Sequence, residues 1–171
     1  MINNKDFSTS SIIKATDNHV DQIAKWLSDP NTNIFLSSNL RSKQVSISMI
    51  KVTIKRIDQS WNIVSYENCP VGIIVLDSYD QIDGIINLWY LIGEKNLRGK
   101  SIMSRAIKKF MKNLPFKLDV VTAWVGSNNK ASIKCLEKAE FKKIGRISNS
   151  FKVDGVHDRI LFEKLVSENG K

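Results

Sequence analysis

Residues 85–114 read IINLWYLIGEKNLRGKSIMSRAIKKFMKNL, and this stretch decides the fold. Its first eight residues are apolar almost without alternation, as expected of a central strand that is covered on both faces. After a polar turn, apolar residues recur at helical spacing from Ile102 to Leu114, and Lys and Arg occupy the opposite face. Pro115 closes this helix. The stretch therefore predicts a buried strand followed by an amphipathic helix, as in an α/β domain.

Strand and helix signals continue on both sides of this unit. Segment 41–57 fits both patterns, and its length favours a helix. Before residue 85 the sequence predicts a strand at 11–15, a helix at 16–28 that ends at Asp29-Pro30, a loop or short helix at 31–40, a helix at 41–57, and strands at 61–66 and 71–76. After residue 114 it predicts a strand at 118–125, a helix at 128–139, and a hairpin of 141–151 with 156–165 that turns at Asp154-Gly155. This order of elements shows no internal repeat.

Length and composition are those of an ordinary globular protein. At roughly 100 to 200 residues per domain, the 171 residues favour one domain at 1–171, with residues 1–10 as a flexible N-terminal segment. No window reaches the roughly 18 to 20 apolar residues of a membrane span, and the first residues lack a secretory-signal pattern. We therefore expect a cytoplasmic protein with no membrane partner. Cys69 and Cys135 lack metal-ligand spacing, which predicts two reduced thiols and no metal site.

The net charge of +9 is concentrated in one part of the chain. Residues 95–146 hold 14 Lys and Arg against 3 acidic residues, whereas the rest of the chain holds 12 basic and 14 acidic residues. Clustered positive charge favours an anionic partner, either a phosphorylated cofactor or a nucleic acid. A solvated helix face is the alternative interpretation.

The turn Leu97-Arg98-Gly99-Lys100-Ser101 lies between the buried strand and the basic helix. The first amides of a helix lack partners within the helix, and the helix dipole favours negative charge, so this turn can hold phosphate oxygens. It matches neither the GxxxxGK[ST] loop nor the dinucleotide-binding GxGxxG motif. A basic helix cap without a ligand is the alternative.

A further segment, residues 129–141, reads NKASIKCLEKAEF and follows the next predicted strand. Together, the turn and this segment resemble the GNAT superfamily of acyl-coenzyme A (acyl-CoA) dependent N-acetyltransferases. The turn resembles the pyrophosphate loop Q/R-x-x-G-x-G/A of that family, and the segment resembles its second cofactor-contacting helix. The order of elements is also similar over nearly the whole chain. Ser101 and Met103 stand where the loop usually has small residues, and Glu140 stands where Gly usually precedes the Phe.

The resemblance implies an α/β (α+β) fold: a single GNAT-like domain with a central mixed, mostly antiparallel sheet of about seven strands, flanked by about four helices. The central strands of this sheet are expected to splay apart. The resemblance also implies acetyl-CoA or another short acyl-CoA as co-substrate, no metal, and direct transfer of the acyl group to a primary amine. The residues implied to bind the cofactor are Tyr90, Leu91, Ile92, Arg98, Gly99, Lys100, Ser101, Ile102, Met103, Asn129 and Lys130.

Amine acylation needs a neutral amine and a proton for the departing thiolate. Leu136 stands where many relatives have a Tyr, and similarity to the ribosomal-protein N-terminal acetyltransferases implies Ser132 as the hydroxyl nearest the sulfur. A hydroxyl that bonds its own helix is the alternative. Spacing does not single out a general base, and a water chain is possible; Asp158 is our first candidate, beside His157, Asp80, Asp83 and Glu67.

The acceptor is not identified by any motif. Trp89, Phe35 and His157 are candidates for contacting it, with packing or surface roles as alternatives. The long turn at 92–100 resembles polysaccharide-associated amino-sugar N-acyltransferases, so a nucleotide-linked amino sugar is our first hypothesis. A protein N-terminus or another small amine comes second. A nucleic-acid-binding module at 95–146 would expose aromatic residues, but Phe110 and Trp124 fall on buried registers, so we expect no nucleic-acid partner. Monomer and homodimer both remain open.

Overall fold

The computed structural model describes residues 10–42 and 45–166, so nearly all of the expected flexible segment 1–10 lies outside the described residues. The strands are β1 (Ser10–Lys14), β2 (Ser60–Tyr66), β3 (Cys69–Asp80), β4 (Ile85–Ile92), β5 (Val120–Gly126), β6 (Lys142–Lys152) and β7 (Val156–Leu165). The α-helices are α1 (Val20–Ser28), α2 (Pro30–Asn33), α3 (Ser38–Ser42), α4 (Ile47–Thr53), α5 (Ile102–Phe110) and α6 (Lys130–Lys138). Two 3₁₀ helices, η1 (Asp17–His19) and η2 (Lys95–Leu97), precede α1 and α5.

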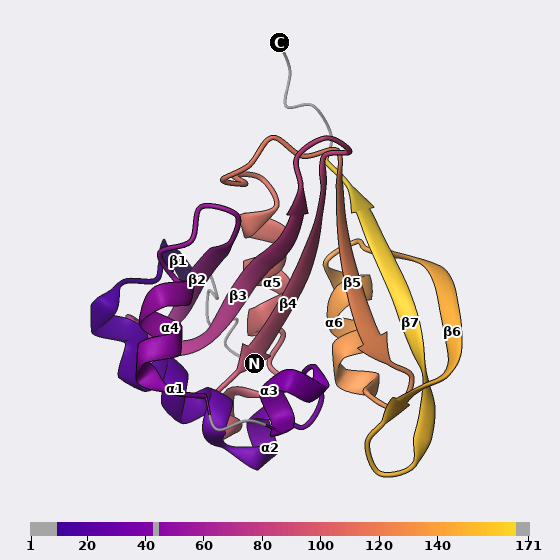
Figure 1. Ribbon diagram of the computed structural model, residues 1–171, viewed down its shortest axis with the longest axis horizontal. Helices are drawn as coiled ribbons and strands as arrows, with labels where there is room; N and C mark the ends of the chain where they lie inside the picture. The colour runs from indigo at the N-terminus through magenta and orange to yellow at the C-terminus, as the bar shows by residue number, and fades with distance from the viewer. Residues whose placement is uncertain (1–9, 43–44, 167–171) are drawn as a thin grey trace, which may run out of the picture.

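All seven strands form one sheet in the order β1-β2-β3-β4-β5-β7-β6. Every neighbouring pair is antiparallel except β4 and β5, which run parallel. Their pairing covers only Ile85–Asn87 against Val120–Thr122. Beyond these residues the two strands diverge into a V (Figure 1). The expected mixed sheet with splayed central strands is thus confirmed.

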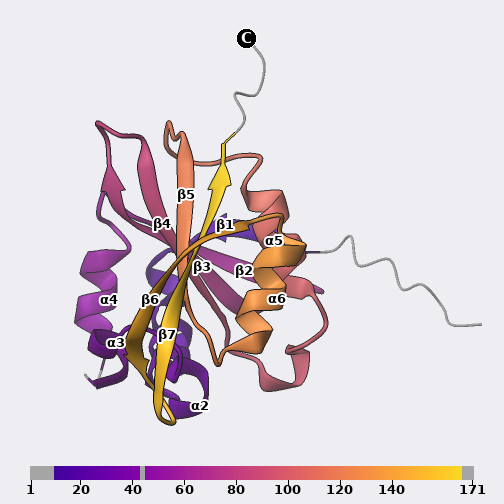
Figure 2. The ribbon, with the colours of Figure 1, turned by 90° about the vertical axis from the view of Figure 1, so that its right-hand side faces the viewer.

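Helices cover both faces of the sheet. Figure 2 shows α3 and α4 on one side and α5 and α6 on the other. The core is divided accordingly: Ile102, Ala106 and Leu136 belong to the cluster on the α5/α6 side, and Ile23 and Ile50 to the cluster on the other side. The buried strands between the two clusters explain the near-continuous apolar run of β4. No helix in the described part of the chain is long and apolar enough to cross a membrane.

The segment between α1 and β2 differs most from expectation. The helix expected at 41–57 is reduced to α4, because the side chain of Ser46 accepts a hydrogen bond from the amide of Met49 and starts a new helix there. The loop or short helix expected at 31–40 becomes α2 and α3, and α2 begins at Pro30 with Asp29 as its N-cap. The described residues therefore hold six α-helices rather than about four.

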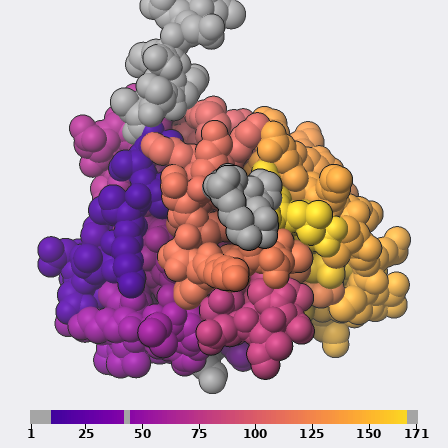
Figure 3. All heavy atoms as spheres, turned by 90° about the horizontal axis from the view of Figure 1, so that it is seen from above, coloured from indigo at the N-terminus to yellow at the C-terminus, as the bar shows by residue number. Residues whose placement is uncertain are grey.

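The narrow end of the V is closed by loops. The hydroxyl of Tyr79 donates to the carbonyl of Lys117 at 3.1 Å, and the ring of Tyr79 lies 4.7 Å from that of Phe116. The amide of Asp119 donates to the carbonyl of Gly84 at 2.8 Å. Figure 3 views this end from above and shows the turn after β3 beside the segment that follows α5. The strands can separate only toward the opposite end.

Candidate active site

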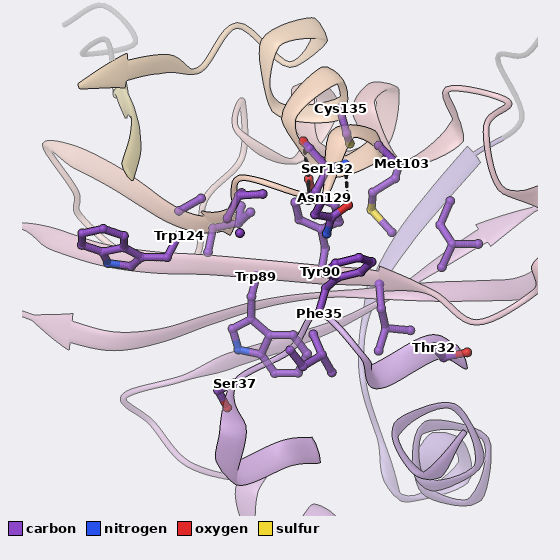
Figure 4. A pocket seen from close by; sticks show the side chains of 18 of the residues that line it. Thr32, Phe35, Ser37, Trp89, Tyr90, Met103, Trp124, Asn129, Ser132 and Cys135 are labelled. Atoms are coloured by element: carbon purple, nitrogen blue, oxygen red, sulfur yellow. Dashed lines mark hydrogen bonds between the residues drawn. The ribbon is translucent and has the colours of Figure 1, made fainter. Parts of the chain in front are cut away.

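A cavity of about 1100 Å³ lies where β4 and β5 separate. Residues of α5 and α6 line one side of it, and residues from α2 to α4 line the other side. Figure 4 shows Met103, Ser132 and Cys135 on the first side of the strands and Phe35 and Ser37 on the second. Because β4 has no partner along this edge beyond Asn87, its backbone groups can face the cavity. The cavity therefore connects the two faces of the sheet.

The turn before α5 is open to the solvent side of the cavity. Gly99 has a φ of +77°, and no heavy atom lies within 4 Å of the position that a Cβ would take. Ser101 caps α5 in the left-handed conformation, with φ 57° and ψ 18°. Its hydroxyl accepts a hydrogen bond from the Lys138 ammonium at 2.7 Å. An open turn, unpaired helix amides and a nearby lysine form a site for an anion.

Arg98 lines the cavity and also joins two segments of the protein. Its Nε donates to the carbonyl of Ile92 at 3.2 Å, and its terminal nitrogens donate to the carbonyl of Asn31 at 3.1 Å and the hydroxyl of Thr32 at 2.9 Å. These bonds tie the end of β4 to α2. With four hydrogen bonds to protein oxygens, Arg98 positions these segments, and one of its five N–H donors is left for a ligand, so contact with the cofactor stays a prediction.

Tyr90 and Ser132 form a pair of hydroxyls on the α5/α6 side. Their oxygens are 2.6 Å apart, and the Tyr90 hydroxyl also donates to the carbonyl of Ser132 at 3.1 Å. The side chain of Asn129 fixes this position by accepting from the Ser132 amide at 3.1 Å. Burial raises the pKa of Tyr90 well above 10, and burial also raises the pKa of the neighbouring Cys135 thiol to about 11. Both groups therefore carry their protons at neutral pH.

The α2–α4 side contains a carboxylate that the sequence analysis missed. Oδ2 of Asp77 accepts from the Trp89 indole at 2.8 Å, and Oδ1 accepts from the Asn87 amide at 2.9 Å. The Trp61 ring packs edge-on against Trp89 at 5.3 Å. Among the described residues that line the cavity, Asp77 is the sole acidic side chain. The sequence predicts a strand only at 71–76, whereas β3 continues to Asp80, so Asp77 is expected in a turn and not at the cavity.

An aromatic and cationic corner closes one end of the α2–α4 side. The ring of Phe35 stacks on that of Phe151 at 6.4 Å. The guanidinium of Arg41 lies 5.4 Å from the centroid of the Phe151 ring, and that of Arg159 lies 5.7 Å from it. Arg41 also donates to the carbonyl of Lys152 at 3.2 Å, which joins α3 to the end of β6.

Several expected site residues lie elsewhere. Asp158 is not part of the cavity lining, because its carboxylate pairs with Arg146 and accepts from the Asn149 amide at 2.9 Å. His157 lies outside the lining too, with its Nε2 3.2 Å from the carbonyl of Asp154. The lining also omits Lys100 and the other base candidates Asp80, Asp83 and Glu67.

The structure brings most of the other expected residues together. The expected burial of Trp124 is wrong, because 44% of it is exposed at the cavity wall, whereas Phe110 is buried. The expected site residues that line the cavity are Phe35, Trp89, Tyr90, Leu91, Ile92, Arg98, Gly99, Ser101, Ile102, Met103, Asn129, Lys130 and Ser132.

Comparison with known proteins decides the family. A sequence profile described as acetyltransferase (GNAT) domain matches residues 11–142. The chain belongs to the GNAT acetyltransferase family. This GNAT chain is therefore an acyl-CoA dependent N-acyltransferase, in agreement with the motifs at 97–103 and 129–141. A comparison with curated protein sequences found no match.

Solved structures show the same fold. Spermidine N-acetyltransferase from Vibrio cholerae, in complex with CoA and spermine, has a TM-score of 0.81 at 14% identity, over 94% of this chain and 97% of that chain. The Salmonella typhimurium acetyltransferase that modifies the N-terminal serine of ribosomal protein L7/L12 has a TM-score of 0.76 at 14% identity, over 94% and 96%. An N-acetyltransferase from Staphylococcus aureus Mu50 has a TM-score of 0.74 at 20% identity, over 94% and 100%. At these identities the likeness concerns the fold alone.

The residues of this GNAT domain fit CoA. The open turn at Gly99 and the free amides at the start of α5 suit a pyrophosphate, and Lys130, Lys134 and Lys138 line the same side of the cavity. In the described residues, no group of three or more His, Cys, Asp or Glu side chains is placed to hold a metal ion.

Proposed function

We propose that this GNAT enzyme transfers an acetyl or other short acyl group from acyl-CoA directly to a primary amine of a small molecule. The observation that carries this proposal is the cavity that crosses the sheet between β4 and β5. One side of the cavity offers the anion-binding turn, and the other side offers Asp77 and indole rings. The donor and the acceptor amine can therefore meet in the gap.

Acyl-CoA supplies an activated thioester, and the protein has to hold it and move protons. The open turn at Gly99 and Ser101 would hold the pyrophosphate, and the edge of β4 that β5 leaves unpaired beyond Asn87 would bind the amide groups of the pantetheine arm. The raised pKa of Cys135 leaves its thiol protonated, so it is a poor nucleophile. Direct transfer to the amine is the route that these residues support.

Ser132 is the proposed proton donor to the departing thiolate. Its hydroxyl lies 2.6 Å from that of Tyr90, whose raised pKa keeps the phenol protonated. As Ser132 gives its proton to the thiolate, the Tyr90 hydroxyl would turn from the Ser132 carbonyl and pass its proton to the Ser132 oxygen. Tyr90 then regains a proton from solvent, which receives the proton that the acylated nitrogen releases. The two hydroxyls thus form a short relay from β4 to α6.

Asp77 is proposed to attract the acceptor amine. An ammonium group beside its carboxylate is favoured electrostatically, and the indole rings of Trp61 and Trp89 provide an adjoining apolar wall. Before attack this ammonium gives one proton to solvent through a water chain, because only the neutral amine is a nucleophile. The two hydrogen bonds that Asp77 accepts hold its carboxylate in place, so its side chain loses little conformational entropy when the amine binds.

A small molecule is favoured over a protein N-terminus as acceptor. The contact of Arg41 with Lys152 and the stacking of Phe35 on Phe151 close one end of the α2–α4 side, which leaves less room for a chain to pass through. The nucleotide-linked amino sugar stays our first hypothesis within this class, and cytoplasmic location stays an expectation.

The proposal is tested by measuring release of CoA thiol from acetyl-CoA with a panel of small primary amines, and by identifying the products by mass spectrometry. We expect at least one amine to be acetylated, and Asp77→Asn to raise its KM about tenfold or more, because a charged hydrogen-bond acceptor is lost. Asp80→Asn, on the same strand but outside the lining, is the matched control. If acetyl-CoA binds but no amine or peptide N-terminus is acetylated, the proposed function is wrong.

A further inference from the structure

The guanidinium of Arg159 faces the cavity without a polar partner. Arg159 lies on β7 opposite Gly126 of β5, and its side chain is part of the lining. Its neighbour Ile160 points into the core on the α5/α6 side, so Arg159 projects to the opposite, α2–α4 side. Among the residues that the structure describes, the guanidinium makes no hydrogen bond or ion pair, and its contact is with the face of Phe151.

The carboxylates of Asp158 and Asp77 are both bound to partners other than Arg159. Asp158, the next residue in the chain, pairs with Arg146. Asp77 belongs to β3, on the other arm of the V, and accepts from Asn87 and Trp89. A second guanidinium, that of Arg41, lies over the same Phe151 ring, and its Nε is buried without a partner among the described residues. The corner therefore has an uncompensated positive charge.

The local packing holds Arg159 in a defined orientation. Gly126 lies so close to Phe151 that a Cβ would meet the ring at 2.5 Å, and Phe35 stacks on the same ring at 6.4 Å. A planar guanidinium above an aromatic ring keeps its donors directed outward, where they match two oxygens of a carboxylate or phosphate. A site with this chemistry selects an oxyanion.

We propose that Arg159 binds an oxyanion of the acceptor, so that the acceptor carries a carboxylate or phosphate in addition to the amine that is acylated. This inference rests on the proposed function and narrows its substrate class. Asp77 on one arm of the V and Arg159 on the other arm then recognise opposite charges of the same molecule. The amine lies in the gap between the arms, beside the Tyr90 and Ser132 hydroxyls.

The first test uses matched acceptors: glucosamine with glucosamine 6-phosphate, and glycinamide with glycine. For the wild-type enzyme we expect kcat/KM to favour, in one pair, the member that carries the oxyanion over the member that lacks it by about 10- to 100-fold, the range expected for a charge-assisted hydrogen bond. The phosphate pair and the carboxylate pair distinguish the two oxyanions. Arg159→Gln should abolish this preference by raising KM for the acceptor that carries the oxyanion. Arg159→Lys should keep part of the preference, because Lys has the positive charge but lacks the paired N–H donors of a guanidinium.

Lys143→Gln is the matched control, because it removes one positive charge from the same hairpin, and Lys143 is exposed and lies outside the cavity lining. It should keep the wild-type preference. Equal kcat/KM values for both members of both pairs would overturn the inference while leaving the proposed function intact. A rise in the Kd for CoA in Arg159→Gln, with the acceptor preference unchanged, would assign Arg159 to the cofactor instead.

A binding measurement separates this inference from the proposed function. Glucose 6-phosphate and acetate have no amine and cannot react, so their binding to the CoA-loaded protein is followed by calorimetry or chemical-shift titration. We expect one of them to bind the wild type and Lys143→Gln, and to lose affinity in Arg159→Gln. Absence of this loss contradicts the oxyanion site, whether or not any amine is acetylated.

Discussion

The hydroxyl pair Tyr90 and Ser132 allows a double-mutant test of proton transfer. The perturbations are Tyr90→Phe, Ser132→Ala and the combination of both. Positioned proton transfer typically contributes about 10² to 10⁴ in rate, so Ser132→Ala should lower the rate of the chemical step by about 10². Affinity for acyl-CoA should stay within a few fold, because neither hydroxyl is required to hold the cofactor.

The 2.6 Å separation of the two oxygens sets the expected coupling. If the hydroxyls act in series, removing the second one after the first costs little, so the double variant should be about as slow as Ser132→Ala alone. Independent roles would multiply the two losses. The assay is single-turnover acyl transfer with donor and acceptor both saturating.

Two results would refute this reasoning. Wild-type rates in Ser132→Ala, under conditions where chemistry limits the rate, would leave Ser132 as a helix residue that only bonds its neighbours. Multiplicative losses in the double variant would show that Tyr90 does not act through Ser132. A circular dichroism spectrum and a melting curve for each variant control for misfolding.

Three further predictions concern the turn before α5 and the thiols. Arg98→Gln should lower the free energy of unfolding by about 1–3 kcal/mol, since bonds to Ile92 and Thr32 are lost; an unchanged urea midpoint would contradict the positioning role. Ser101→Gly should be more stable than Ser101→Ala by about 1 kcal/mol, because both lose the hydroxyl but only Gly relieves the positive φ; equal melting temperatures would argue against left-handed strain. The double substitution of Cys69 and Cys135 to Ser should keep most activity, and an acylated cysteine that turns over at the catalytic rate would disprove direct transfer.

The sequence predicted the strands of the sheet better than the short helices between α1 and β2. The apolar run of β4 and the helical period of α5 are strong local signals, and both elements begin where they are expected, although α5 ends at Phe110 instead of at Leu114. Helices α2 and α3 have four and five residues, too few for a periodic pattern, so their caps and tertiary contacts define them.

The site was predicted in part for the same physical reason. Motif spacing predicted Ser101, Asn129 and Ser132 as cavity residues because each lies at or near the start of a helix. Helix starts have recognisable residue patterns in the sequence. The sequence did not predict the place of Asp77 in the cavity or the partners of Arg98, because both depend on contacts between segments that are distant in the chain. Arg98 reaches Thr32 across 66 residues, and only the folded chain shows which protein oxygens its guanidinium binds.

The divergence of β4 and β5 also has a consequence for the order of events in turnover. Residues of α5 and α6 line one side of the cavity and residues from α2 to α4 line the other, so in the proposed reaction the donor and the acceptor use different sides, and either product can leave while the other stays bound. Initial-rate plots for such an enzyme intersect rather than run parallel, and CoA and the acylated amine each compete chiefly with the reactant that binds on the same side. The three-residue contact at Ile85–Asn87, which lets the strands part so early, thereby shapes the kinetic scheme as well as the fold.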